Sequence, residues 1–130
     1  MKRLLALLCC AAVSVPAMAE NWQLLALHDD STVFYKSSSA EHAKGTARLW
    51  LLTDYREIGF INSKPYISSK HLAEFDCSGR RMRTLSGYST TGRMGSGTVI
   101  SSVEYSDADW SDVVPDSTGE LALVVACGKK

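Results

Sequence analysis

The ten residues from 46 to 55, TARLWLLTDY, alternate between two kinds of side chain. One set is nearly all apolar and consists of Ala47, Leu49, Leu51, Thr53 and Tyr55. Because successive side chains of a β-strand point to opposite faces of its sheet, the alternation predicts a strand that packs this set against a core. Trp50 belongs to the other set, between the charged residues Arg48 and Asp54. Its indole either covers the second face of the sheet or belongs to a binding site there.

Other stretches rich in apolar, β-branched or aromatic residues predict further strands, at 22–27, 32–35, 66–77, 80–89 and 98–105. Ser78-Gly79 is a turn signal, so residues 70–89 are expected to form a β-hairpin. The polar residues 37–45 are predicted to be a loop, with room for one helical turn. Residues 56–65, which contain glycine, asparagine and proline, are predicted to be a connection.

The C-terminal segment carries a helix signal. Ser117-Thr118-Gly119-Glu120 has the pattern of a capping box, with Ser117 as the N-cap and Glu120 as the third helical residue. An apolar run follows to Cys127, and Gly128 suits the position just past a helix end. We therefore expect a short C-terminal helix. The alternative is a final buried strand, because the run LALVVA has no polar break.

Residues 1–19 have the features of a secretory signal peptide. A basic start at Lys2-Arg3 precedes an apolar run of about a dozen residues and the pattern Ala17-Met18-Ala19, which predicts cleavage before Glu20. The run is too short to cross about 30 Å of hydrocarbon, so no transmembrane segment is expected after cleavage. The mature chain, residues 20–130, would form one domain of 111 residues with a formal net charge of −2.

Two cysteines, Cys77 and Cys127, remain in the mature chain. In an exported domain such a pair most simply forms one disulfide, which would hold the C-terminal helix against the sheet. A metal site would need histidines at ligand spacing, and His28, His42 and His71 are scattered. The residues thus predict an α+β fold, an antiparallel sheet with a short C-terminal helix tethered by a disulfide.

Composition and motifs argue against several functions. Hydrophobic residues make up 45% of the chain and charged residues 22%, which suits a folded domain. A formal net charge of zero disfavours nucleic-acid binding. No G-x-S-x-G motif and no metal-ligand spacing occur, so we expect neither an enzyme nor a metal protein. The acidic pairs Glu74/Asp76 and Asp107/Asp109 are interpreted as solvated edges, and the alternative is that either pair holds a cation or faces a basic partner.

A basic cluster is the best candidate for partner binding. Arg80, Arg81 and Arg83 lie at the predicted hairpin turn, and Lys70 lies farther back on the neighbouring strand. Guanidinium groups bind carboxylates, sulfates and phosphates, so an acidic protein segment, a glycosaminoglycan or an anionic envelope polymer would suit this cluster. In the alternative interpretation, these arginines form ordinary cross-strand pairs with Glu74 and Asp76. Trp50 on the adjoining strand completes the candidate binding set.

The ordered motifs of the mature chain resemble the surface-adhesin protein E-like domain family of proteobacteria. The matching pieces are Trp22, residues 48–55 (RLWLLTDY), residues 72–77 (LAEFDC), residues 80–83 (RRMR), Trp110, residues 115–117 (PDS) and Cys127. The likeness covers nearly the whole mature chain. The most specific piece is Glu-Phe-Asp-Cys followed by basic residues and a distant Pro-x-Ser and Cys.

The resemblance implies a sheet of about six antiparallel strands with a C-terminal helix tied to it by a disulfide. It also implies an adhesin that attaches to host matrix and serum proteins such as laminin, vitronectin and plasminogen, that binds haem and that forms dimers. Haem would need an axial ligand such as His28, His42, His71 or Tyr88 beside an apolar slot. The alternative function is a periplasmic small-ligand or inhibitor-type protein that uses the cavity between helix and sheet.

The family resemblance implies an outer-membrane lipoprotein, and this chain departs from that pattern. Leu8 precedes Cys9, and Cys9 itself precedes Cys10, so no small residue stands where a lipidation motif requires one. The departure favours a soluble periplasmic protein, with the outer membrane or cell surface as the alternative location.

Overall fold

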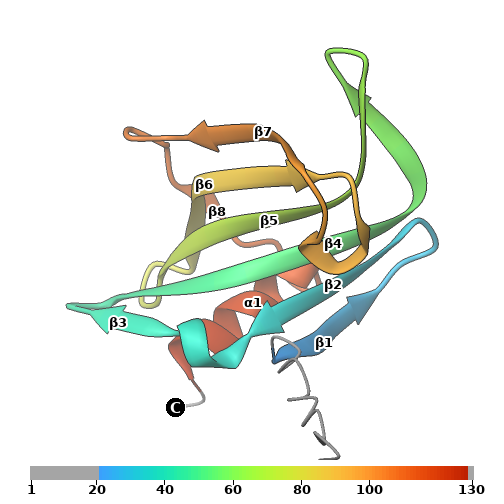
Figure 1. The fold of residues 1–130 in the computed structure, drawn as a ribbon. Coiled ribbons are helices and arrows are strands. Elements are labelled where there is room, and N and C mark those ends of the chain that lie inside the picture. The colour runs from blue at the N-terminus through green and yellow to red at the C-terminus, as the bar shows by residue number, and fades with distance from the viewer. Residues whose placement is uncertain (1–20, 129–130) are drawn as a thin grey trace, which may run out of the picture.

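The structure is a computed structural model that describes residues 21–128, and the predicted signal peptide lies outside them. One sheet and one helix make up the domain (Figure 1). The strands are β1 (Trp22–Leu27), β2 (Ser31–Lys36), β3 (Glu41–Ala43), β4 (Thr46–Ile61), β5 (Lys64–Asp76), β6 (Arg81–Thr90), β7 (Val99–Glu104) and β8 (Ser111–Asp112). The helix α1 spans Thr118–Cys127, and 3₁₀ turns η1 and η2 lie at Ser37–Ser39 and Arg93–Gly95.

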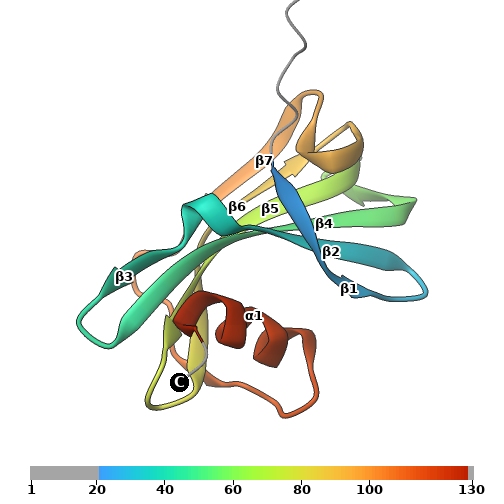
Figure 2. The ribbon, with the colours of Figure 1, turned by 90° about the horizontal axis from the view of Figure 1, so that it is seen from below.

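The sheet is antiparallel, in the order β1-β2-β4-β5-β6-β7. The short strands β3 and β8 pair with β4 and β6 outside this path. Figure 2 shows α1 against one face of the curved sheet, which we call the inner face, and the opposite face is the outer face. The predicted fold class is confirmed, with six principal strands and two short additional ones.

The core lies between α1 and the inner face. It contains Ala47, Leu49 and Leu51 of β4, Ala73 and Phe75 of β5, and Ala122, Leu123 and Ala126 of α1. Leu49 and Phe75 are fully buried. Leu49 pairs with Ala73 across the β4–β5 ladder, which places the apolar residues of both strands on one face. The prediction that the odd-numbered residues of the β4 segment meet the core is therefore confirmed for these three positions.

The C-terminal segment is a helix, as its capping pattern predicts, and the alternative of a final strand is wrong. Ser117 Oγ accepts a hydrogen bond of 3.3 Å from the Glu120 N–H. The Glu120 carboxylate in turn accepts one of 2.8 Å from the Asp116 N–H. At the other end of α1, the predicted disulfide between Cys77 and Cys127 is present and ties the helix to the end of β5.

The prediction that residues 56–65 form a simple connection is wrong. The strands β4 and β5 continue as a hairpin arm that extends beyond the rest of the sheet (Figure 1). Asn62 and Ser63 both have positive φ, at 49° and 64°, as a tight two-residue hairpin turn requires. Gly59 faces Tyr66 across the ladder, and a Cβ at Gly59 would lie only 2.5 Å from the Tyr66 ring. The glycine therefore lets the aromatic ring pack and does not end the strand.

The predicted loop 37–45 also holds structure, because it contains η1 and the short strand β3. Among residues 21–128, no helix has the length and apolar character needed to cross a membrane.

Candidate binding site on the outer face

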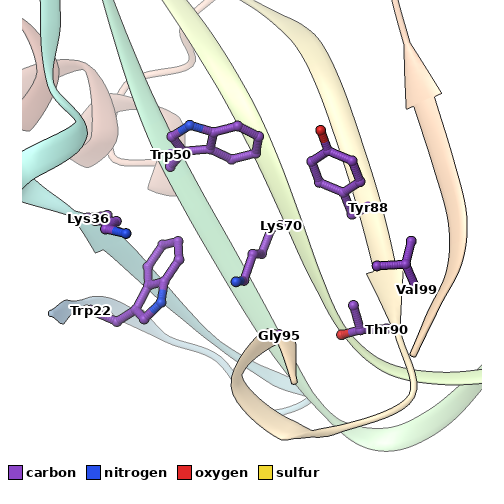
Figure 3. Close-up of a pocket in the computed structure, with 8 residues that line it drawn as sticks. All are labelled: Trp22, Lys36, Trp50, Lys70, Tyr88, Thr90, Gly95 and Val99. Carbon is purple, nitrogen blue, oxygen red and sulfur yellow. The ribbon is translucent and has the colours of Figure 1, made fainter. Parts of the chain in front are cut away.

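A groove of about 360 Å³ opens on the outer face of the sheet. Six strands and the η2 turn contribute to it, through Trp22, Lys36, Trp50, Lys70, Tyr88, Thr90, Gly95 and Val99 (Figure 3). The register explains this convergence. Trp22 pairs with Lys36 in the β1–β2 ladder, and Lys70 pairs with Leu52 on one side and with Tyr88 on the other. Paired residues of neighbouring strands point to the same face, so side chains far apart in sequence meet here.

An aromatic platform forms one part of the groove. The rings of Trp50 and Tyr88 lie 5.8 Å apart between centroids, with only 21° between their planes. They come from β4 and β6 and lie diagonally across β5. Figure 3 shows the two rings beside each other, with Lys70 between them and Trp22. Trp50 thus lies on the outer face and lines the groove there.

Two lysines give the groove its charge. The Nζ of Lys70 lies 5.5 Å from the centroid of the Trp22 ring, and the Nζ of Lys36 lies 6.0 Å from it. At such distances the negative face of an indole attracts an ammonium group. No acidic side chain lines the groove within the described part of the chain. The groove therefore combines aromatic faces with the ammonium groups of two lysines.

The η2 turn forms a wall of the groove and is held by the buried Ser68 and the half-buried Asp54. The Ser68 hydroxyl accepts a hydrogen bond of 2.8 Å from the Gly95 N–H and donates one of 2.6 Å to the Gly92 carbonyl. Asp54 Oδ1 accepts a hydrogen bond of 3.1 Å from the Met94 N–H. These contacts fix Gly95 beside the groove.

Gly95 itself is required by both space and conformation. Its φ is +72°, and a Cβ there would lie 2.1 Å from Cε of Lys70. Lys70 thus packs its stem against the turn, which restricts where its ammonium group can lie.

The predicted arginine cluster lies elsewhere and is paired with acidic groups. Arg81 contacts Asp76 at 2.6 Å, and Arg83 contacts Glu74 at 2.6 Å. Arg80 contacts Glu120 of α1 at 2.5 Å. The alternative interpretation, in which the arginines form cross-strand pairs with Glu74 and Asp76, therefore describes the geometry of Arg81 and Arg83 but not that of Arg80.

The pKa values of the two acids follow from these contacts. Burial alone would raise the pKa of Glu74, but hydrogen bonds from Arg48 and Arg83 outweigh it and lower the pKa below its usual value. A hydrogen bond from Arg81, and then one from the Gly79 N–H, lowers the pKa of Asp76. Both acids remain ionised at neutral pH and hold the hairpin together.

A third tryptophan covers this arginine cluster. The guanidinium carbons of Arg83 and Arg81 lie 4.3 Å and 5.6 Å from the centroid of the Trp110 ring. Along β5, Lys70 lies six positions before Asp76, the partner of Arg81, and four positions before Glu74, the partner of Arg83. These separations correspond to about 20 Å and about 13 Å along an extended strand. Lys70 and Trp50 thus belong to the groove, whereas Arg80, Arg81 and Arg83 do not line it.

Trp22 and Lys36 are groove residues that the sequence analysis did not single out. Their pairing depends on a register shift between Leu24 and Ala26 in the β1–β2 ladder, because the register near the turn alone would place Trp22 opposite Ser37. Tyr88 was considered only as a haem ligand. Its stacking against Trp50 depends on the order of the strands in the sheet, which no local sequence pattern predicts.

The three histidines occupy separate places. His28 Nε2 lies 2.9 Å from Thr118 Oγ1 at the start of α1, and His42 Nε2 lies 2.8 Å from the Ala126 carbonyl near its end. His71 lies on the inner face and lines a cavity of about 310 Å³ between sheet and helix. Burial lowers the pKa of His71. Residues 21–128 contain no group of three or more side chains arranged to hold a metal ion.

A single sheet with one face packed on a helix and the other face bearing an aromatic, cationic groove is the architecture of a binding domain. The chain belongs to the surface-adhesin protein E family, whose model matches residues 22–128. The sequence resemblance is thus confirmed, and with it the coarse prediction of an adhesin-like protein.

Solved structures of Haemophilus influenzae protein E have the same fold. One crystal form has a TM-score of 0.63 at 9% identity, over 79% of this chain and 91% of that chain. Protein E from non-typeable Haemophilus influenzae has a TM-score of 0.59 at 11% identity, over 84% of this chain and 78% of that chain. No curated protein sequence matches the chain significantly.

Proposed function

We propose that this chain is a non-catalytic attachment module of the cell envelope, which binds an anionic partner through the groove on its outer face. The observation that carries the proposal is the convergence of the Trp50–Tyr88 platform with Lys36 and Lys70 in one groove. Aromatic faces supply contact area at a low cost in side-chain entropy, and the ammonium groups supply charge complementarity.

The arginine hairpin is less suited to this role. Each of its guanidinium groups already contacts a carboxylate, and a partner would have to displace that carboxylate. Displacement from Glu74 would be the most costly, because only 5% of its side-chain surface is exposed. Binding through this cluster would therefore break contacts that hold the fold together.

The proposed partners are host extracellular-matrix or serum proteins, or anionic polymers of the envelope. Membership of an adhesin family supports the first class, and the charge of the groove suits acidic regions of either. The predicted signal peptide and the disulfide support export, with the periplasm or the cell surface as the site of action.

The test compares two double variants of the mature chain that lose the same charge. Lys36→Gln/Lys70→Gln changes the groove, whereas Lys44→Gln/Lys64→Gln changes two exposed lysines outside it. Binding is measured to immobilised laminin, vitronectin and plasminogen and to purified envelope polymers. We expect at least tenfold weaker binding for the groove variant and less than a twofold change for the control. Equal losses in both variants would overturn the proposal.

A second candidate is supported by the inner cavity. We propose binding of a small ligand with an apolar body, haem included, beside His71. This imidazole lines a cavity that also contains Val33, Leu51 and Met82, and its lowered pKa favours the neutral form that ligates iron. Titration with hemin should shift the Soret band for the natural chain and leave it unshifted for His71→Ala. A shift of the same size in the variant, or none in either protein, would eliminate this candidate.

A further inference from the structure

We infer that the edge strand β7 binds an extended segment of a partner protein, which joins the sheet as one more antiparallel strand. The partner segment carries apolar residues at alternate positions and basic residues at its ends. The residues that receive it, 101–105, do not line the outer-face groove, so this surface is distinct from the one proposed above. Three features carry the inference: unpaired main-chain groups, a cavity beside the strand and acidic side chains at its end.

The strand β7 leaves main-chain groups unpaired along one side. It is the last strand of the sheet, and Figure 1 shows it at the margin opposite β1. The Tyr105 N–H donates a hydrogen bond of 2.8 Å to the Leu85 carbonyl. Because an antiparallel strand bonds its neighbour at every second residue, Val103 also bonds β6, whereas the N–H and C=O groups of Ser102 and Glu104 point away from it. An added strand would pair with these outward groups.

The edge of β7 has little of the protection that sheet edges usually carry. Natural proteins block such edges with proline, lysine or a β-bulge. The sequence of β7, VISSVE, contains neither proline nor lysine, and its one charged residue, Glu104, is the last. Its register shift lies at its start, so residues 101–104 pair regularly with β6. The other edge strand, β1, has a register shift in its middle, between Leu24 and Ala26, which makes β7 the better edge for strand addition.

A cavity of about 260 Å³ lies beside β7 on the inner face of the sheet. Gly87 and several serines line it and leave space, while Ile61 of the hairpin arm, Val103 and Tyr105 give it apolar surface. Val103 and Tyr105 are 40% and 47% exposed. Every second side chain of an added strand would lie on this face beside the cavity, and an apolar side chain there would cover the exposed surface of Val103 and Tyr105.

Acidic side chains lie at and beyond the end of β7. Glu104, Asp107 and Asp109 are exposed, and none of the three forms an ion pair with a residue between 21 and 128. Arg81 and Arg83 contact acids of β5 instead. Three like charges so close in sequence attract cations, so a basic residue at the end of the partner segment would be favoured there.

The experiment uses the isotopically labelled mature chain and a synthetic peptide in which valine and threonine alternate between lysines at both ends. Proton–nitrogen NMR measures the dissociation constant and the hydrogen exchange of each amide. Saturating peptide should slow exchange of the Ser102 and Glu104 amides at least tenfold and leave the Val103 amide, which already bonds β6, nearly unchanged. A peptide with glutamates in place of the lysines should bind at least tenfold more weakly, and equal binding of the two peptides would overturn the inference.

N-methylation of the peptide tests the pairing itself. With its valines on the side of the cavity, the threonines of the peptide lie opposite Ser102 and Glu104 and point their N–H groups toward β7. A peptide with N-methylated threonines should therefore bind at least tenfold more weakly. N-methylated valines should change the dissociation constant less than threefold, because their nitrogens point away from the sheet. The same loss for both peptides would contradict strand addition.

A proline variant tests the same contact from the side of the protein. Ser102→Pro removes an outward N–H and no bond to β6, a position at which edge strands tolerate proline. It should weaken binding of the lysine peptide at least tenfold, whereas Ser102→Ala, which keeps the N–H, should change it less than twofold. Full binding by a folded Ser102→Pro chain would refute the proposed contact. Circular dichroism verifies folding, and if the proline variant unfolds, the N-methylated peptides decide on the natural chain.

A second copy of the chain is the competing occupant of this edge. Slower exchange of the Ser102 and Glu104 amides as the concentration of peptide-free protein rises would assign the edge to self-association and overturn the inference. The groove is tested separately, because Lys36→Gln/Lys70→Gln should bind the lysine peptide within twofold of the natural chain.

Discussion

The disulfide makes a prediction whose size follows from its position in the chain. Cys77 and Cys127 are 50 residues apart, and their bond closes a loop that contains β6, β7, β8 and most of α1. On the chain-entropy model, closing a loop of this length in the unfolded state stabilises the fold by about 4 kcal/mol. For a domain of this size, that free energy corresponds to roughly 15–20 °C in melting temperature.

Urea unfolding of the mature chain, followed by circular dichroism, measures this contribution. The oxidised protein should be more stable than Cys77→Ala/Cys127→Ala by about 4 kcal/mol. Dithiothreitol should lower the stability of the natural chain toward that of the variant and leave the variant unchanged. A difference under about 1 kcal/mol would refute the reasoning, because it would mean that the unfolded chain gains little freedom when the loop is opened.

Three further substitutions test the local contacts. Glu74→Gln should cost about 2–3 kcal/mol at pH 7, because charge-assisted hydrogen bonds from two arginines are weakened. The pKa of Glu74 is lowered in the folded state, so the stabilisation from this carboxylate is present above its unfolded value of about 4.3 and is lost as the pH falls through the folded pKa. Urea unfolding should therefore show a smaller difference in stability between the natural chain and Glu74→Gln at pH 3 than at pH 7. Gly95→Ala should weaken anion binding, because its methyl group would displace Lys70. The control, Gly45→Ala, also has positive φ but open space around it, so it should lose only stability. Calorimetry measures the loss of binding, and thermal melting measures the loss of stability. Ser117→Ala should lower stability by about 1 kcal/mol through loss of the helix cap, which thermal melting monitored at 222 nm detects; an unchanged melting temperature would contradict this role.

The parts of the fold that depend on local chemistry were predictable. The alternation over residues 46–55 assigned Ala47, Leu49 and Leu51 to the core face, because the period of a strand needs no knowledge of its neighbours. Ser117 and Glu120 marked the start of α1 for the same reason, since a capping box lies within one turn.

The hairpin arm shows where local signals misled. Gly59, Asn62 and Pro65 are common in connections, and together they suggested that the strand had ended. In the structure all three residues are compatible with the hairpin arm. Gly59 leaves room for the Tyr66 ring, Asn62 begins the tight turn, and Pro65 lies near the end of the arm. Asn62 and Ser63 both adopt positive φ, but the pair lacks the glycine that usually marks a two-residue hairpin turn in a sequence, so no turn signal pointed to the arm.

The groove could not be predicted because it depends on long-range pairing. Lys70 was grouped with the arginines of the hairpin, since both are basic and near in sequence. The register instead places it between Leu52 and Tyr88, and Trp22 of the edge strand β1 approaches it on the same face. Period-two alternation tells which residues share a face within a strand, but strand order decides which of them meet.

The three tryptophans allow the central claim to be tested in one measurement. Trp22 and Trp50 line the outer-face groove, whereas Trp110 covers the arginine cluster. A proton–nitrogen NMR spectrum of the mature chain contains one indole N–H signal for each. Titration with a host protein or an anionic envelope polymer shown to bind should shift or broaden the signals of Trp22 and Trp50 and leave that of Trp110 in place. A shift confined to Trp110 would contradict the account and would assign attachment to the arginine hairpin.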